Sequence, residues 1–293
     1  MKRTYTSYIK YISGLLLFGF NGIVSSKIHL SSYEIVLFRT FMGSLFLALI
    51  FFITRKQKLD LKNTNKKELM YLILSGISMG GSWIFLYEAY VRIGVGLSSI
   101  AYYCGPVIVM LSSPFVFKEK IKLKQILCFA TVFVGIILIT ISSCTDANID
   151  MYGFFCGIIS AVLHALMVIF TVKAPSITGN KNSMIQLIVS FLTILLLIGF
   201  HLPIQFPSDG VQWFWMIFLG IVNTGLGCYL YFSDISKLSV QSVSILGYLE
   251  PLSAVVFSVI LLSEGFTFWE VLGAILVLAG SVISEIKIKK NIK

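Results

Sequence analysis

The sequence predicts an all-α integral membrane protein with ten transmembrane helices in two inverted five-helix repeats. Three observations lead to this fold class: the composition, the recurrence of uncharged windows along the chain, and an internal repeat. Of the 293 residues, 57% are hydrophobic and only 12% are charged, and the mean hydropathy is +0.91. These values exceed what the core of a globular protein needs and are typical of a polytopic membrane protein.

An internal repeat relates residues 69–140 to residues 214–285 at a constant offset of 145, without a gap. The shared positions include Gly80 and Gly225, Tyr103 and Tyr248, Pro106 and Pro251, Glu119 and Glu264, and Gly135 and Gly280. Because an odd number of spans separates equivalent positions, the second copy is upside down in the bilayer relative to the first. Many secondary transporters have this architecture.

The first repeat unit, residues 11–143, is expected to contain five spans. They are marked by uncharged windows and lie at about 8–26, 33–54, 69–91, 97–117 and 124–143. A window shorter than the roughly 20 residues that cross a bilayer core reaches that length once one interior or flanking charge is admitted. Lys2, Arg3 and Lys10 precede or enter the first span, but no small-residue cleavage site follows it. We therefore expect a retained span rather than a signal peptide.

The second repeat unit, residues 152–286, is expected to contain the other five spans. They lie at about 151–172, 183–200, 211–232, 241–262 and 268–286. Uncharged windows mark these spans as well, and a window that is too short reaches the length of a span once one interior or flanking charge is included. Thr267 followed by Glu270 predicts a capping box at the start of the tenth span.

The basic residues are distributed unequally between the two sides of the membrane. If the N-terminus is cytoplasmic, the inner segments hold all of the 23 lysines and arginines except Lys27 and Arg92, which lie in outer loops, and Arg39, which lies inside a span. This asymmetry is the positive-inside pattern. The net charge of +10 therefore reflects topology and predicts no nucleic-acid partner. We expect a multi-pass protein of the cell membrane (inner or plasma) with both termini cytoplasmic.

Neither the cysteines nor the aspartates form a pattern typical of an enzyme or a metal site. The five cysteines lie in or at the ends of spans without a CxxC motif or metal-ligand spacing. All aspartates lie in loops or at span ends, and the sequence has no HExxH motif. We therefore expect no metal, no cofactor and no enzymatic activity.

Glu250 is the most informative candidate binding residue. It lies nine residues into the ninth span, hence roughly 14 Å from the inner surface at about 1.5 Å per residue, near mid-membrane. A carboxyl group at that depth either meets a cation or a proton path, or is a structural group bonded to amides loosened at Pro251. Pro106 and Pro251 lie at matching depth in the fourth and ninth spans and are predicted to kink both helices.

Two further polar residues lie at a similar depth. His164, in the sixth span, is either a proton carrier or a satisfied packing residue. Asn223, in the eighth span, either faces a cavity or forms a hydrogen bond between helices. Both remain candidate substrate-binding residues.

Aromatic side chains supply the other candidate binding residues. Trp83, Tyr103 and Tyr248 lie deeper in their spans than Tyr87 and Tyr90, which we expect at the membrane interface. Aromatic faces attract cations, so the three deep rings are predicted to line a cavity with Glu250. Core packing is the alternative for each of them.

Arg39 is the one cation well inside a span, near the outer third of the second helix. Its plausible partners at that depth are Glu34 and Glu88, although Glu88 already has Arg92 at the i+4 position. We predict a structural ion pair.

The most specific local pattern in the chain is Gly247-Tyr248-Leu249-Glu250-Pro251, followed by Leu261-Leu262-Ser263-Glu264 and a last span with Gly273, Ala274 and Gly280. Together with the duplicated five-span unit, it resembles the EamA family of the drug/metabolite transporter superfamily. The resemblance implies a carrier with a central cavity lined mainly by helices 1, 3, 4, 6, 8 and 9, and export of amino acids or other small metabolites. Ser263 replaces the family's usual glycine. The first copy has Gly105 where the second has Glu250, so any role of this glutamate belongs to one half.

These observations favour a secondary transporter, with export as the expected direction, that moves an amino acid, an amine or a cationic drug by alternating access. The alternatives are a carrier of neutral metabolites or nucleosides, and a channel-like facilitator. The expected partners are a small-molecule substrate and the lipid bilayer, with protons as a candidate coupling ion.

The charge asymmetry generates a test of topology. In a background without the native cysteines, single cysteines at Asp146, Asp209 and Gly265 are expected to react with an impermeant thiol reagent in intact cells, because these positions lie in predicted outer loops. A cysteine at Lys62 is expected to react only after permeabilisation. Labelling of position 62 from outside would overturn this arrangement.

Overall fold

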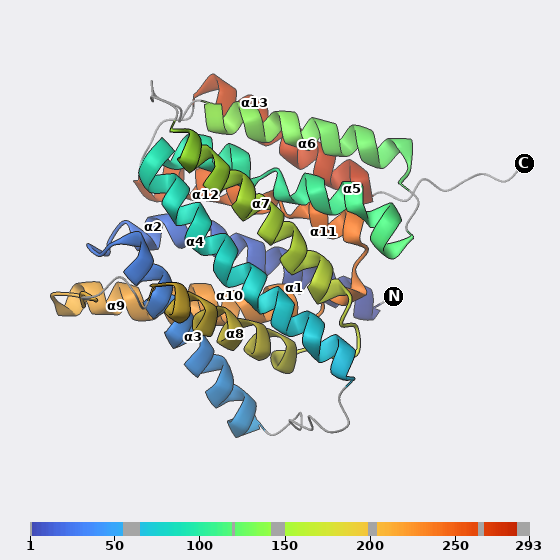
Figure 1. Cartoon of the computed structure of the whole chain (residues 1–293). Helices are drawn as coiled ribbons and strands as arrows, with labels where there is room; N and C mark the ends of the chain where they lie inside the picture. Colours follow the sequence, from blue (N-terminus) through green and yellow to red (C-terminus); the bar gives the residue numbers. More distant parts are fainter. Residues whose placement is uncertain are drawn as a thin grey trace, which may run out of the picture.

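The chain forms a helical bundle in the computed structural model, which describes residues 2–54, 65–118, 121–141, 150–198, 204–262 and 267–285. Within these ranges no strand occurs, which confirms the all-α class. The first half contains α1 (Lys2–Gly19), α2 (Asn21–Ser25), α3 (Ser32–Thr54), α4 (Lys66–Tyr102), α5 (Gly105–Phe117) and α6 (Leu123–Ile141). The second half contains α7 (Met151–Val172), α8 (Asn180–Ile198), α9 (Gly210–Phe218), the π-helix η1 (Leu219–Leu226), α10 (Gly227–Phe232), the 3₁₀ helix η2 (Ile235–Lys237), α11 (Val240–Leu246), α12 (Leu249–Leu262) and α13 (Phe268–Glu285). Figure 1 shows their arrangement.

Within the described residues, six helical stretches are long and apolar enough to cross a membrane. They are Tyr5–Ser25, Ser32–Thr54, Lys66–Ile93, Met151–Val172, Asn180–Ile198 and Gly210–Lys237. Three shorter apolar helices accompany them, at Gly105–Phe117, Leu123–Ile139 and Val271–Ser284. The described residues therefore form a multi-pass helical bundle, whereas ten spans in two inverted repeats stay a prediction. Of the four positions chosen for labelling, only Asp209 lies within the described residues.

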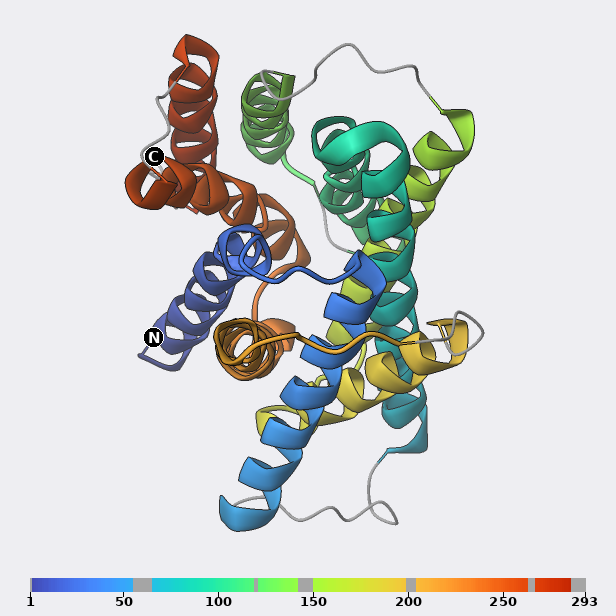
Figure 2. The same ribbon diagram turned by 90° about the vertical axis from the view of Figure 1, so that its left-hand side faces the viewer.

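The helix α4 covers the predicted third span and the start of the fourth, and it turns back on itself between them. A Cβ atom added to Gly157 would lie 2.8 Å from the Cβ of Ala101 and 3.9 Å from the Cβ of Ala89. A straight helix would separate these two alanines by roughly 18 Å. The turn between them, the wide teal coil at the top of Figure 2, thus replaces the loop predicted at residues 92–96.

The fourth and ninth predicted spans are interrupted at equivalent positions of the repeat. The break at residues 103–104 precedes Pro106, and the break at residues 247–248 precedes Pro251. Both prolines therefore lie in the first turn of a new helix, where a missing N–H leaves no carbonyl unpaired. The sequence predicted that the two helices kink at the prolines. In the structure each helix is instead interrupted just before its proline. A third break, at Phe20, separates α1 from α2.

The helices α6 and α13 cross closely at glycines and lie side by side in Figure 1. A Cβ atom added to Gly273 would lie 2.5 Å from the carbonyl oxygen of Gly135, and one added to Gly280 would lie 2.6 Å from Val132. Small residues allow such contact between backbones in a membrane, where van der Waals packing replaces the hydrophobic effect.

Polar contacts join the span ends at one end of the bundle. The N–H of Ser176 donates to the Glu68 carboxylate at 2.8 Å, and the N–H of Gly179 donates to the carbonyl oxygen of Ser233 at 2.8 Å. All four residues lie in or beside segments predicted to be cytoplasmic.

A second set of contacts joins segments predicted to be outside. The N–H of His29 donates to the side-chain oxygen of Gln212 at 3.0 Å, and Arg92 pairs with Asp150 at 3.2 Å. The hydrogen bond from Arg92 lowers the pKa of Asp150, and the backbone N–H of Gln212 lowers the pKa of Asp209. Both carboxylates also cap helix N-termini, at α7 and α9. The two sets of contacts agree with the predicted alternation of spans, and which end faces the cytoplasm stays a prediction.

The crossing of α6 and α13 generates a stability test. Gly273→Ala is expected to lower the free energy of unfolding by about 1–3 kcal/mol, because the new methyl group meets backbone rather than a flexible side chain. Gly210→Ala is the matched control, since no atom lies within 4 Å of a Cβ atom added there. Melting temperatures in detergent compare the two variants. Equal temperatures for Gly273→Ala and the wild type would contradict the close crossing.

Candidate functional site

A cavity of about 340 Å³ lies where helices of both halves meet. The helices α1, α2, α3, α4, α7, α10 and α12 contribute to its wall. The lining residues are Phe18, Asn21, Gly22, Ser25, Arg39, Met79, Ser82, Trp83, Leu86, Tyr87, Tyr90, Tyr102, Tyr103, His164, Met167, Cys228, Tyr231, Phe232 and Glu250. The volume suits a small metabolite. Four of the six predicted binding residues therefore line one cavity: Trp83, Tyr103, His164 and Glu250.

Glu250 reaches the cavity because the ninth predicted span is broken. α12 begins at Leu249, so Glu250 lies in the first turn of a helix, where the helix dipole favours a negative charge. Among the described residues, no group forms a hydrogen bond with its carboxyl oxygens. The carboxyl group is therefore available to a ligand.

Arg39 enters the cavity from α3, and only 5% of its surface is exposed. Its Nε donates a hydrogen bond to the Thr224 hydroxyl at 3.0 Å, and its guanidinium carbon lies 4.7 Å from the centre of the Trp83 ring. These contacts differ from the predicted ion pair with Glu34 or Glu88.

The two carboxylates predicted to pair with Arg39 have other partners. Glu34 accepts hydrogen bonds from the N–H of Ser31 at 3.0 Å and from the N–H of Gln205. Glu88 pairs with Arg92 at 2.6 Å. Both glutamates are thus engaged near the outer loops, whereas Arg39 points inward from a position deeper in α3.

His164 and the tyrosines form one wall of the cavity. The Nδ1 atom of His164 lies 2.7 Å from the Tyr102 hydroxyl, and the two rings meet edge to face. A Cβ atom added to Gly105 would lie 3.0 Å from the His164 ring, so the glycine makes room for the histidine. His164 therefore has both a packing contact and a polar partner, while it still lines the cavity.

Tyr248 and Asn223 are not among the residues that line the cavity: Tyr248 packs in the core, which was the alternative for this ring, and Asn223 forms hydrogen bonds between helices, which was the alternative for this amide. Tyr248 is fully buried, and its hydroxyl donates to the carbonyl oxygen of Tyr103 at 2.8 Å, which ties together the two equivalent helix breaks. The Asn223 amide donates to the carbonyl oxygen of Leu17 at 3.1 Å and to the Asn21 side chain at 3.2 Å. Both side chains support interrupted helices.

Sequence reasoning did not place several polar residues in the cavity, among them Asn21, Ser25, Arg39 and Tyr231. The available signal for Arg39 was its isolation as the one cation within a span. Tyr231 carried no signal, because tyrosines of membrane proteins are common at interfaces and in cores.

The cavity extends toward the end of the bundle that carries the predicted outer loops. Asn21, the exposed Gly22 and Ser25 lie on that side. On the opposite side of Glu250 the bundle is filled by buried side chains, among them Tyr11, whose hydroxyl donates to the carbonyl oxygen of Val243 at 2.9 Å.

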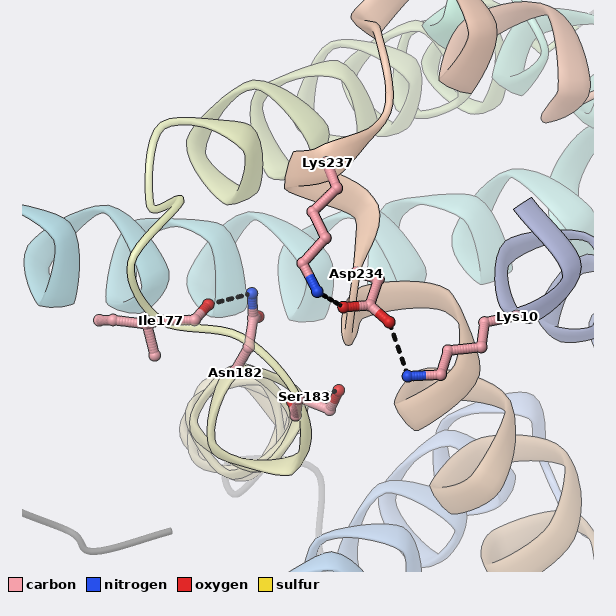
Figure 3. A network of polar contacts seen from close by, with 7 residues as sticks. Lys10, Ile177, Asn182, Ser183, Asp234 and Lys237 are labelled. Atoms are coloured by element: carbon pink, nitrogen blue, oxygen red, sulfur yellow. Dashed lines mark hydrogen bonds and ion pairs between the residues drawn. The ribbon is translucent and has the colours of Figure 1, made fainter. Parts of the chain in front are cut away.

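An ion-pair cluster lies beyond this packed layer. Asp234, whose side chain is 10% exposed, pairs with Lys10 at 2.6 Å and also with Lys237. Figure 3 shows the carboxylate between the two ammonium groups. Lys10 belongs to α1 and Asp234 precedes η2, so the cluster joins the first half to the second at the predicted cytoplasmic end.

Several known proteins are similar to this chain. An "uncharacterized transporter YxxF" of Bacillus subtilis (strain 168) is 25% identical over 288 residues, which cover 98% of this chain and 91% of that protein. A "probable amino-acid metabolite efflux pump" of Salmonella typhimurium is 25% identical over 232 residues, which cover 75% of this chain and 77% of that protein.

A solved crystal structure has the same fold, with a TM-score of 0.83 at 14% identity over 95% of this chain and 97% of the other. The model of the EamA-like transporter family matches residues 6–141 and residues 151–285. Because these two matches cover most of the sequence, the chain belongs to the EamA-like transporter family and is a transporter rather than an enzyme.

Proposed function

We propose that this protein is a secondary transporter that exports a small amino-acid-like metabolite across the cell membrane. The observation that carries the proposal is the cavity between the two halves, which holds the Glu250 carboxyl group and the Arg39 guanidinium group but no ion pair between them among the described residues. A charge that is buried, as on Arg39, or partly buried, as on Glu250, is unfavourable without a partner, so each group favours a ligand of opposite charge.

The substrate chemistry follows from the wall of the cavity. An ammonium group of the substrate pairs with Glu250, and the faces of the tyrosine rings add cation–π attraction. The apolar part of the substrate packs on Met79, Leu86 and the aromatic rings. The name of the Salmonella relative, an amino-acid metabolite efflux pump, agrees with this choice.

The mechanism we propose is alternating access between two inverted halves, residues 11–143 and 152–286, with both termini in the cytoplasm. The contact between Tyr103 and Tyr248, which are equivalent residues of the repeat, supports such a pseudo-symmetric arrangement. The packed layer and the cluster of Lys10, Asp234 and Lys237 close one end, which supports an outward-facing carrier rather than an open pore. A proton on Glu250 provides a route for coupling transport to the pH gradient.

The first test is transport by purified protein in proteoliposomes loaded with the twenty common amino acids and a set of small amines. Wild-type protein is expected to move at least one amino acid, faster with a pH gradient than without. Glu250→Gln is expected to reduce this flux by about tenfold or more, because the loss of a charge-assisted hydrogen bond amounts to about 1.5–3 kcal/mol. Mass spectrometry of the vesicle contents measures the flux.

Glu88→Gln is the matched control, since Glu88 pairs with Arg92 outside the cavity. Equal melting temperatures of the variants establish that folding is intact. Full flux and full pH dependence in a folded Glu250→Gln protein would remove Glu250 from the mechanism, and transport of no amino acid by the wild type would overturn the proposed substrate class.

The second test concerns closure of the cytoplasmic end. Lys10→Gln is expected to shift the protein toward the inward-open state by about fivefold, which corresponds to the loss of about 1 kcal/mol from the ion pair. A cysteine at Ser244 reports on this opening, because Ser244 lines a small space between the closed end and Glu250. The rate of its labelling by an impermeant thiol reagent in inside-out vesicles is the measured quantity.

Lys66→Gln removes a charge from the exposed start of α4 and serves as the control. Lys10→Arg keeps the positive charge beside Asp234 and is expected to keep the slow labelling of the wild type. The same labelling rate in Lys10→Gln as in the wild type would mean that the cluster has no gating role.

A further inference from the structure

We infer that Arg39 forms a carboxylate-binding subsite of the cavity, held in position by Trp83 and by Thr224 of the π-helix η1. The inference deepens the proposed function and rests on it for the identity of the transported molecule, which then carries a carboxylate as well as an ammonium group. The anion site itself can be tested without knowledge of the substrate.

The hydrogen-bond donors of Arg39 are mostly unused. A guanidinium group has five N–H donors and no acceptor. One of them, on Nε, donates to Thr224, and no described residue accepts from the donors on the two terminal nitrogens. Because only 5% of Arg39 is exposed and the side chain lines the cavity, these donors point to a ligand. A carboxylate accepts two parallel hydrogen bonds from this edge of a guanidinium group.

Trp83 holds the plane of the guanidinium group. The guanidinium carbon lies over the Trp83 ring at 4.7 Å from its centre, which is within the range of a cation–π contact. Stacking occupies a face of the group and leaves its edge free for hydrogen bonds in the plane. Trp83 therefore orients Arg39 without competing with an anionic ligand.

Thr224 holds the Nε of Arg39 through its hydroxyl oxygen, because the hydroxyl proton is donated elsewhere. Its hydroxyl donates to the carbonyl oxygen of Leu219 at 2.8 Å, five residues earlier, so the same oxygen accepts from Arg39. In an α-helix a threonine hydroxyl bonds the carbonyl three or four residues earlier. The wider π-turn thus determines where the hydroxyl oxygen lies, and π-turns often occur at functional sites.

Close contacts at glycines hold α3 against η1 near Arg39. A Cβ atom added to Gly43 would lie 3.0 Å from the carbonyl oxygen of Gly220, and one added to Gly225 would lie 2.7 Å from the Phe46 ring. The two backbones are therefore in close contact one turn from Arg39, which keeps the distance between Arg39 and Thr224 short. On another side of the cavity, Glu250 is available to the ammonium group of the same molecule.

The test uses acetate as a bare carboxylate probe and the fluorescence of Trp83 as the signal. Trp213, Trp215 and Trp269 are replaced by Phe, so that Trp83 is the remaining tryptophan. Sodium acetate is titrated against sodium chloride at constant ionic strength in purified protein. Saturable quenching or enhancement is expected in the parent protein, and at least about tenfold weaker binding in Arg39→Gln, because a charge-assisted bidentate contact is lost.

Thr224 is tested as a positioning residue. Thr224→Val keeps the shape and removes the hydroxyl, and it is expected to weaken acetate binding about three- to tenfold, since the hydrogen bond to Nε is lost. Thr224→Ser keeps the hydroxyl and is expected to restore binding. Melting temperatures are measured for every variant, so a loss of binding that follows unfolding is recognised.

The outcomes separate the inference from the proposed function. An absence of saturable acetate binding in the folded parent protein overturns the carboxylate subsite. Unchanged binding in a folded Thr224→Val protein overturns the positioning role of Thr224, even if Arg39→Gln fails to fold. Acetate binding that depends on Arg39, in a protein that transports no amino acid, supports the subsite and refutes the proposed substrate class.

Discussion

Inside a bilayer, every backbone N–H and C=O group must find a partner within the protein, and the rest of this structure depends on that constraint. Continuous helices meet it by themselves, so the interruptions are the places where side chains must help. The Asn223 amide bonds the carbonyl oxygen of Leu17 near the break between α1 and α2. The Tyr248 hydroxyl bonds the carbonyl oxygen of Tyr103 between the two equivalent breaks. Fully buried polar side chains thus stabilise the irregular backbone.

The same irregularities bring polar groups to the cavity. Glu250 follows the break between α11 and α12, Asn21 follows the break after α1, and Tyr103 lies within the break before α5. The π-turn of η1 supplies the Thr224 hydroxyl that holds Arg39. These four departures from regular α-helix therefore lie beside the site, as expected where discontinuous helices line a water-accessible space.

The contacts between the two halves differ in how easily they can separate. The crossing at Gly135 and Gly273 is close packing of backbone on backbone, which resists separation but allows sliding. The contact of Lys10 with Asp234 is an ion pair near the end of the bundle, where water can solvate both groups after they part. The proposed alternation between two states requires both kinds of contact, one kept throughout the cycle and one broken in it.

The sequence by itself determined the helical membrane fold, the order of the helices and the family. Hydropathy and the repeat carry this information, because apolar length and charge asymmetry act on the chain locally. The turn within α4, the partners of Arg39 and the roles of Tyr248 and Asn223 were decided only by the tertiary structure. In a membrane helix the surfaces that face lipid and those that face protein are both apolar, so the sequence does not reveal which way each side chain points. The orientation of each helix is set by contacts with residues distant in the chain.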